Sequence, residues 1–229
     1  MKKVLLGAVA ALALGISGAL AAQLGSANGT RTDAGHLVGN PDAPVKLIEF
    51  MSYTCPHCGQ FAKKADNALH LGYAESGKVS VEYRPMVHDP VDLTVTMLVD
   101  CAGPHKFAAA HATFMERQDG WLGRARRAPA AQRQVWSDAP RSAERRRSIA
   151  SSLELYPMVE PLGLDRIRAD RCLADQARAD ALLAAADASR TEFGVRGTPS
   201  FALNGVLLAG THDWASLRPQ IDVRLQNAN

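Results

Sequence analysis

The stretch that decides the fold is Val-Lys-Leu-Ile-Glu-Phe-Met at residues 45–51, followed after three residues by Cys-Pro-His-Cys at residues 55–58. The near-continuous apolar run predicts a β-strand covered on both faces, and a helical pattern begins right after the second cysteine. We therefore expect the cysteines at a strand-to-helix junction, where unpaired N–H groups and a partial positive charge favour the thiolate. Because the thiolate is the nucleophile in disulfide exchange, this position predicts a reactive dithiol.

The two residues between the cysteines refine this interpretation. Pro56 is expected in the first helical turn, where its missing N–H costs nothing. His57 can direct a hydrogen bond or a positive charge at the Cys55 sulfur and so stabilise the reduced form. Cys55 is then the exposed attacking sulfur, and Cys58, one turn into the helix, the shielded resolving sulfur. A Cys-x-x-Cys alone also fits half of a zinc site or a structural pair.

The strand itself carries a candidate acid. By period-two alternation, Glu49 shares a face with Val45, Leu47 and Met51, which places it beneath the dithiol as a buried carboxyl. The other interpretation is an edge-strand glutamate in contact with water.

A strand–helix–strand unit surrounds the dithiol. Apolar residues recur at helical spacing from Phe61 to Gly72, with Asp66 among the polar residues opposite them. Residues 79–83 alternate as a second strand. This order builds a parallel sheet through a right-handed crossover.

The remainder of the chain is first helical and then returns to β-structure. Asn204-Gly205 is a strong hairpin signal between strands expected at 200–203 and 206–209, and Asp213 can cap a last helix. Four helices are expected before them, over 91–102, 106–117, 143–155 and 164–193. The chain thus reads as a small α/β fold split by an all-helical insertion. Its expected parts are a signal peptide (1–22), a flexible lead-in (23–40), the first part of the α/β domain (41–90), the insertion (91–185) and the second part (186–229).

The N-terminus has the pattern of a secretory signal. Lys2-Lys3 precedes an apolar segment over 4–16, and Ala19-Leu20-Ala21 offers a cleavage site. Cleavage is favoured over an uncleaved anchor, and it predicts a periplasmic protein in an oxidising compartment, where cysteines pair. The mature chain has 24 basic against 23 acidic residues, which argues against nucleic acid as the main partner. The arginine-rich stretch over 117–147 is expected to be a solvated face, with an anionic membrane or an acidic partner as the alternative.

Three separated signatures then resemble one family. Ile48-Glu49-Phe50 with Cys-Pro-His-Cys, a helical insertion, and Gly-Val-Arg-Gly-Thr-Pro-Ser-Phe at residues 194–201 are similar to a DsbA-type thiol:disulfide oxidoreductase. The resemblance covers nearly all of the mature chain. It implies a thioredoxin-like fold interrupted by an all-helical insertion.

The resemblance also implies roles for individual residues. Cys55 corresponds to the nucleophile and Cys58 to the resolving cysteine, while His57 tunes the pair and Glu49 assists proton transfer. The turn at Thr198-Pro199 corresponds to a cis-proline loop facing the dithiol, which leaves the backbone of Thr198 free to pair with an extended substrate peptide.

Cys101 and Cys172 form a second pair, both inside the helical stretch. The resemblance extends to family members, chiefly alphaproteobacterial, that carry an extra pair, and we predict a structural disulfide here. Two buried free thiols are the alternative. The bond would enclose 70 residues, for which loop-closure entropy gives roughly 4 kcal/mol of stabilisation.

The predicted function is donation of the Cys55–Cys58 disulfide to reduced, unfolded secreted proteins. The resemblance implies reoxidation by a DsbB-like membrane quinone reductase. No cofactor is expected beyond the dithiol, and the protein is expected to be a monomer. No metal site is expected, since the other histidines lack the spacing of metal ligands. A disulfide isomerase or reductase is the alternative in the same class, although residues 23–40 are too short for the dimerisation domain of a dimeric isomerase. A zinc-stabilised or peptide-binding module is the non-enzymatic alternative.

Overall fold

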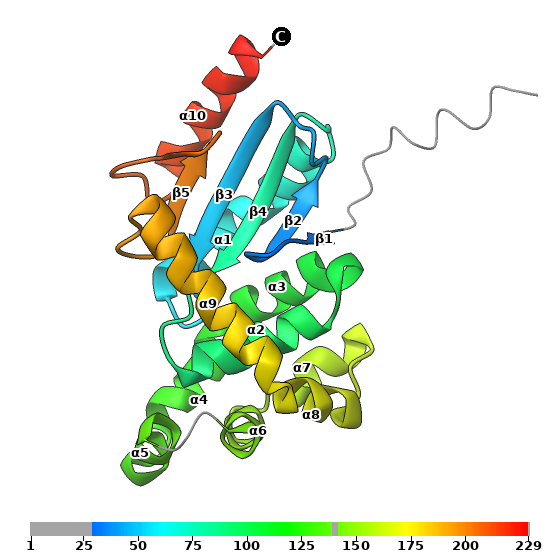
Figure 1. Ribbon diagram of the computed structural model, residues 1–229, viewed down its shortest axis with the longest axis vertical. Coiled ribbons are helices and arrows are strands. Elements are labelled where there is room, and N and C mark those ends of the chain that lie inside the picture. The colour runs from blue at the N-terminus through cyan, green and yellow to red at the C-terminus, as the bar shows by residue number, and fades with distance from the viewer. Residues whose placement is uncertain (1–28, 139–141, 229) are drawn as a thin grey trace, which may run out of the picture.

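A six-stranded sheet forms the upper part of the molecule in Figure 1. The computed structural model describes residues 29–138 and 142–228, so the predicted signal peptide lies outside the described residues. The strand order is β1-β2-β4-β3-β5-β6; β3 and β4 are parallel and every other neighbouring pair is antiparallel. The strands are β1 (Thr30–Arg31), β2 (His36–Gly39), β3 (Val45–Met51), β4 (Val79–Pro85), β5 (Ser200–Leu203) and β6 (Val206–Leu207).

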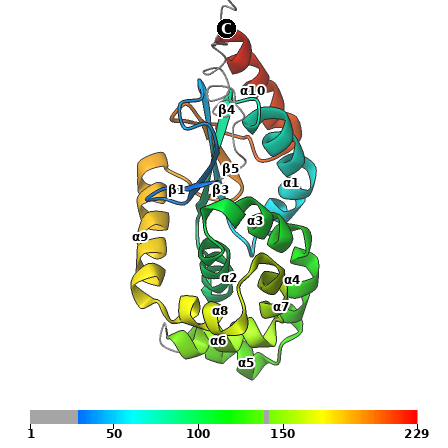
Figure 2. The same cartoon turned by 90° about the vertical axis from the view of Figure 1, so that its right-hand side faces the viewer.

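Helices cover both faces of this sheet. Figure 2 shows α1 (Pro56–Asn67) and α10 (Trp214–Asn227) on one side and α9 (Gln176–Phe193) on the other. The central strand β3 is buried along its length except at Lys46, which confirms the expectation drawn from its apolar run. The thioredoxin-like fold with a helical insertion, predicted from the sequence, is the fold observed.

The helical insertion packs beyond the C-terminal ends of β3 and β4 (Figure 1). It begins where Pro90 occupies the first helical position and the Asp89 side chain accepts hydrogen bonds from the Val91 and Asp92 N–H groups. Its apolar side chains join those of one face of the sheet in a single core, whereas Ile48 and Phe50 on the other face belong to a second, smaller cluster. The helices are α2 (Pro90–Cys101), α3 (Phe107–Glu116), α4 (Gln118–Arg127), α5 (Ala130–Asp138), α6 (Ala143–Ser152), α7 (Tyr156–Val159) and α8 (Arg166–Ala174).

The C-terminal predictions are confirmed in their main features. The hairpin turns at Asn204 and Gly205, both with positive φ, as the two-residue turn requires. Asp213 caps α10 by accepting from the Ser216 N–H at 2.8 Å. The second strand is shorter than expected and ends at Leu207.

Three predictions about organisation are wrong. The lead-in is not flexible where the structure describes it, because β1 and β2 extend the sheet there, and His36 of β2 pairs with Tyr83 of β4. The single helix expected over 164–193 is two helices, α8 and α9. Asp175 separates them by leaving helical geometry and accepting from the Arg178 N–H as the cap of α9. The helix α9 then continues through the boundary expected between residues 185 and 186.

Across residues 29–138 and 142–228, none of the helices combines the length and apolar character needed to cross a bilayer.

Candidate active site

The dithiol lies at the start of α1, just after the loop that follows β3, at the junction of the sheet and the insertion. Cys55 is the N-cap residue of α1 with extended backbone, and Pro56 fills the first helical position. Cys55 is partly exposed, whereas Cys58, one turn further, is fully buried, and both are free thiols. This geometry gives the two sulfurs the unequal access that an attacking and a resolving thiol need.

The surroundings of Cys55 lower the pKa of its thiol from 9.0 to about 5. The largest cause is a hydrogen bond from the Cys58 thiol, and further support comes from the Thr198 side chain and from the backbone N–H groups of Cys58 and His57; partial burial opposes them. His57 thus contributes through its main chain, while its exposed ring lines the groove beside the dithiol. The ring of His57, expected from the sequence to supply this effect, is not among the largest causes.

Cys58 has the opposite electrostatics. Burial raises the pKa of its thiol well above 9.0, and the neighbouring Cys55 sulfur and Glu49 raise it further. At neutral pH, Cys55 is therefore ionised while Cys58 keeps its proton, so the reduced pair carries one proton in total.

Glu49 is fully buried beneath the dithiol, so the interpretation as an edge-strand glutamate in water is wrong. Burial, and next the nearby Asp66, raise the pKa of the Glu49 carboxyl well above 4.5. Neither of its carboxylate oxygens has a hydrogen-bond partner among the described residues. A buried acid whose protonated form is favoured can exchange a proton with a neighbouring thiol.

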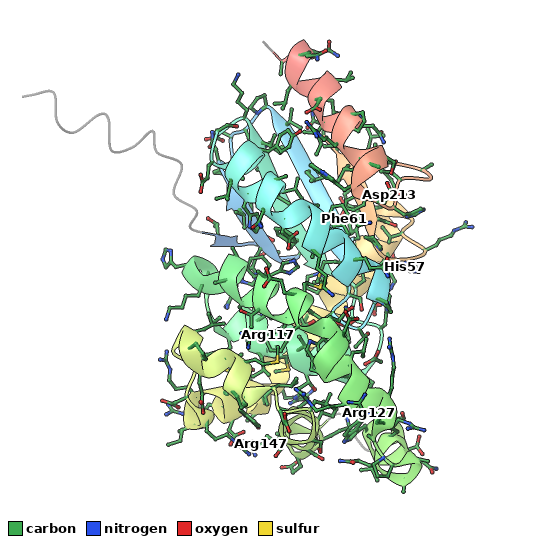
Figure 3. The ribbon with its side chains drawn as sticks, turned by 180° about the vertical axis from the view of Figure 1, so that it is seen from behind. His57, Phe61, Arg117, Arg127, Arg147 and Asp213 are labelled. Atoms are coloured by element: carbon green, nitrogen blue, oxygen red, sulfur yellow. A yellow bond between two sulfur atoms is a disulfide. The ribbon has the colours of Figure 1, made fainter. Side chains whose placement is uncertain are left out.

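The loop at Thr198–Pro199 faces the attacking sulfur. Its peptide bond is cis, and the Cys55 thiol donates to the Thr198 carbonyl oxygen at 3.1 Å. A groove of about 490 Å³ opens next to it, between the start of α1 and the start of α10. Figure 3 labels His57, Phe61 and Asp213 at this groove.

The insertion holds the loop that carries Cys55, which the sequence did not reveal. Asp92 of α2 accepts from the Ser52 hydroxyl and from the Tyr53 and His88 N–H groups; burial raises the pKa of Asp92 to about 6. From α4, the Gln118 amide donates to the backbone carbonyls on both sides of Thr54, at 2.7 and 2.9 Å. Two helices of the insertion therefore fix the loop against the sheet.

Asp66 and His111 are further buried polar residues near the dithiol that sequence reasoning missed. The helical pattern predicts Asp66 on the polar face of α1, but the structure buries it. It follows Cys58 by eight residues, which puts it at the margin of the buried face, and this spacing is the signal that was available. His111, whose spacing from the other histidines predicts no role, is completely buried.

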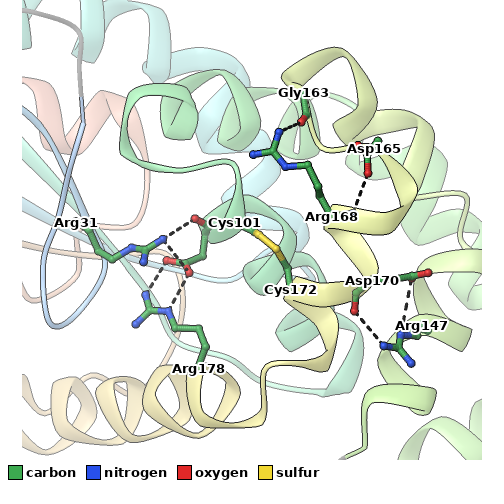
Figure 4. Close-up of a disulfide and its surroundings, with 10 residues drawn as sticks. Arg31, Cys101, Arg147, Gly163, Asp165, Arg168, Asp170, Cys172 and Arg178 are labelled. Atoms are coloured by element: carbon green, nitrogen blue, oxygen red, sulfur yellow. Dashed lines mark hydrogen bonds and ion pairs between the residues drawn. A yellow bond between two sulfur atoms is a disulfide. The ribbon is translucent and has the colours of Figure 1, made fainter.

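The second cysteine pair is a disulfide, as the resemblance implied. Cys101 at the end of α2 bonds to Cys172 of α8, with Cα atoms 6.2 Å apart (Figure 4). Next to it, Asp100 accepts from the Arg178 guanidinium at 2.6 and 2.9 Å and pairs with Arg31 at 3.2 Å. The bond and the ion pairs together hold α2 to the rest of the helical insertion, to α9 and to the start of the sheet.

No group of three or more histidine, cysteine or acidic residues that could hold a metal ion occurs among the described residues. The zinc-stabilised alternative therefore finds no further ligands for Cys55 and Cys58 in that part of the chain.

The sequence model of the thioredoxin family matches residues 31–223. Among solved structures, a protein-disulfide isomerase from Novosphingobium aromaticivorans is 45% identical, with a TM-score of 0.79 over 82% of this chain and 96% of that chain. The Wolbachia pipientis alpha-DsbA1 structure shares the fold, with a TM-score of 0.66 and 19% identity over 84% of this chain and 91% of that chain.

A sequence relative is also named as a protein of disulfide chemistry. A protein of Rickettsia bellii, whose name places it among protein-disulfide oxidoreductases, is 28% identical over 86 residues, 37% of this chain and 33% of that protein. The match thus spans about a third of the length of that relative. The chain belongs to the thioredoxin family. Its fold is shared by the alpha-DsbA1 structure and, at 45% identity, by the protein-disulfide isomerase structure.

The thiolate of Cys55 is expected to appear on titration with a midpoint near the lowered pKa of about 5. Because folding lowers this pKa from 9.0, the ionised thiol stabilises the reduced folded protein fully above pH 9. That stability is lost as the pH falls towards 5. The ultraviolet absorbance of the thiolate, followed against pH in the reduced protein, measures the midpoint. A Cys55→Ser variant should lose the transition, and a midpoint near 9 would contradict the assignment.

Proposed function

We propose that this chain is a periplasmic thiol:disulfide oxidase, which gives the Cys55–Cys58 disulfide to reduced secreted proteins. The observation that carries this proposal is the low pKa of Cys55, about 5, at a partly exposed helix N-terminus. A thiolate this stable makes the reduced form favourable, roughly a hundredfold at pH 7 relative to a thiol of pKa 9. The disulfide is correspondingly easy to give away.

The reaction then runs in two exchanges. A substrate thiolate attacks the Cys55 sulfur of the disulfide, the Cys55–Cys58 bond breaks, and Cys58 leaves as a thiolate that takes a proton from Glu49. A second substrate thiolate attacks the substrate sulfur of the mixed disulfide and displaces Cys55 as a thiolate. The substrate has lost two electrons to the protein, and its disulfide is complete.

Substrate recognition falls to the main chain at Thr198 and to the groove beside it. The Thr198 carbonyl oxygen lies 3.1 Å from the Cys55 sulfur, so a peptide whose cysteine bonds to Cys55 passes alongside this backbone. Backbone pairing tolerates many sequences, as an enzyme acting on varied unfolded proteins requires.

The proposed location rests on the signal pattern at the N-terminus and on the chemistry of the dithiol. An oxidase must be reoxidised after each cycle, and a DsbB-like membrane quinone reductase is the proposed acceptor of its electrons. Fractionation of cells that express the full chain tests the location. Membranes that reoxidise the reduced protein with consumption of a quinone test the partner.

The proposed activity is tested by mixing the oxidised protein with a reduced two-cysteine peptide in equal amounts, without glutathione. We expect a disulfide-bonded peptide and the reduced dithiol to form together. If the peptide stays reduced while the protein stays oxidised, the oxidase proposal is wrong.

Disulfide isomerisation is the second candidate, favoured by the name of the Novosphingobium aromaticivorans structure that is 45% identical. An isomerase acts in its reduced form on wrongly paired disulfides. Recovery of activity by a scrambled multi-disulfide protein, catalysed by the reduced chain, would support this candidate. An oxidase should give little recovery in that assay and rapid oxidation in the peptide assay.

A further inference from the structure

Behind the dithiol, buried polar side chains from several elements form a cluster that continues beyond Glu49. His111 of α3 lies with its Nε2 atom 3.4 Å from Asp66 Oδ2, and its Nδ1 atom is 3.1 Å from the Tyr53 hydroxyl. The ring of His111 packs at 4.7 Å from that of Tyr83. Tyr83 is the neighbour of Glu49 across the parallel strands. Glu49, Asp66 and His111 thus occupy one buried polar region.

This cluster contains polar atoms without a protein partner. Both oxygens of Glu49 and Oδ1 of Asp66 are buried and make no hydrogen bond to any described residue, while Nε2 of His111 has the 3.4 Å contact with Asp66 but no hydrogen bond. Buried polar groups are almost always satisfied, and those without a protein partner are served by internal water. An ordinary packing role would not require Glu49 to feel the charge of Asp66, and Asp66 to contact His111, inside one buried region, so the cluster has the composition of a path for protons.

Asp66 is the member of the cluster that reaches solvent. Its side chain is 10% exposed, whereas that of His111 is 0% exposed, and Glu49 is likewise fully buried. The titratable groups around Glu49 come from each element packed against it: Cys58 and Asp66 on α1, Tyr53 after β3, Tyr83 on β4, His111 on α3 and, behind Tyr83, His70.

We propose that Asp66, oriented by His111, is the proton relay that carries protons between Glu49 and solvent during each redox cycle. The proposal rests on the proposed dithiol chemistry of Cys55 and Cys58 and adds the route by which the proton leaves. Asp66 is a positioning and relay residue: it acts through Glu49 and does not touch the reacting sulfurs.

The proton balance of reoxidation shows why a relay is needed. Burial favours the protonated form of Glu49, so this carboxyl must pass a proton through Asp66 to solvent as it takes one from Cys58. In the mixed disulfide, the Cys58 thiol loses its proton to Glu49 while this transfer takes place, the Cys58 thiolate attacks the Cys55 sulfur, and the partner leaves as a thiolate. Because the relay accompanies the attack, it contributes to the rate of this step.

The test separates the two exchange steps. The reduced protein is mixed with glutathione disulfide, quenched with acid at short times and analysed by mass, so that mixed-disulfide formation at Cys55 and its resolution by Cys58 are timed separately. In Asp66→Asn we expect the rate of the first step to stay within about twofold of the wild-type rate. The rate of the second step should fall about tenfold, which is a modest share of what acid–base catalysis contributes. The acid limb of the pH–rate profile of the second step should also move to lower pH, because the pKa of Glu49 falls when its like-charged neighbour is removed.

Asp119→Asn is the matched control, since it removes one carboxylate of the exposed surface and should change neither step. An unchanged or faster second step in folded Asp66→Asn overturns the relay and leaves the proposed function standing. If instead the wild-type protein forms no mixed disulfide at Cys55, the proposed function fails.

A second measurement needs no variant and therefore does not depend on the folding of Asp66→Asn. The rate of the second step in the wild-type protein is followed through mixtures of light and heavy water. A relay moves more than one proton, so we expect the rate to fall along a curve as deuterium replaces hydrogen. A straight line, which indicates a single proton in transit, contradicts the relay.

Discussion

Replacement of Cys55 by serine is expected to reduce disulfide donation to the uncatalysed background. The serine hydroxyl cannot form the disulfide that is given away, and it is not ionised near neutral pH, whereas the Cys55 thiol has a pKa of about 5. The measurement is the rate at which a reduced two-cysteine peptide is oxidised by a small excess of the oxidised protein. Full retention of this rate, or of biological activity, in Cys55→Ser would favour a peptide-binding module over an oxidoreductase.

Cys58→Ser is the matched variant, because it removes the other sulfur of the same pair. The buried Cys58 should serve only to resolve, so this variant still exchanges at Cys55 but stops at the mixed disulfide. We expect a stable covalent complex with substrate, visible without reductant and absent in Cys55→Ser. Equal trapping by both variants would contradict the roles assigned to the two cysteines.

Removal of the Cys101–Cys172 disulfide is expected to lower the stability of the folded protein strongly. Cys101 and Cys172 are 71 positions apart, and loop-closure entropy for a loop of that size gives about 4 kcal/mol. The double variant Cys101→Ala and Cys172→Ala should therefore lower the free energy of unfolding by about this amount, measured by urea denaturation with the dithiol oxidised in both proteins.

The slope of the denaturation curve is the internal control, since a change in midpoint at constant slope reports stability alone. A loss below about 1 kcal/mol would show that the loop is already restrained in the unfolded chain. Peptide mapping without reductant should first show the linked Cys101–Cys172 peptide in the wild-type protein. Free thiols at both positions would contradict the disulfide.

Local patterns predicted the parts of the molecule that are encoded locally. The strand over residues 45–51 and the start of α1 at Pro56 follow from hydrophobic runs and the position of proline. The burial of Glu49 follows from strand alternation once the strand is known to be central. The cis bond before Pro199 and the Cys101–Cys172 bond came from the family resemblance, because no local pattern encodes either of them.

The remaining features depend on contacts between distant segments. Strand β2 is four residues long and is held by backbone pairing with β4, so it has no hydrophobic period of its own. Asp66 lies at the margin of a helix face, and it is buried because α3 packs against it with His111. Gln118 and Asp92 act on the active-site loop from the insertion, more than 35 residues away along the chain.

The reduction potential of the Cys55–Cys58 pair, measured by equilibration with glutathione buffers, tests the central claim most directly. The values already known for two relatives set the scale: about −120 mV for the oxidase DsbA and about −270 mV for the reductase thioredoxin. A stabilised Cys55 thiolate predicts a potential near the oxidising end of this range. A value near the thioredoxin end would contradict the oxidase proposal and make the chain a reductase that needs a supply of electrons.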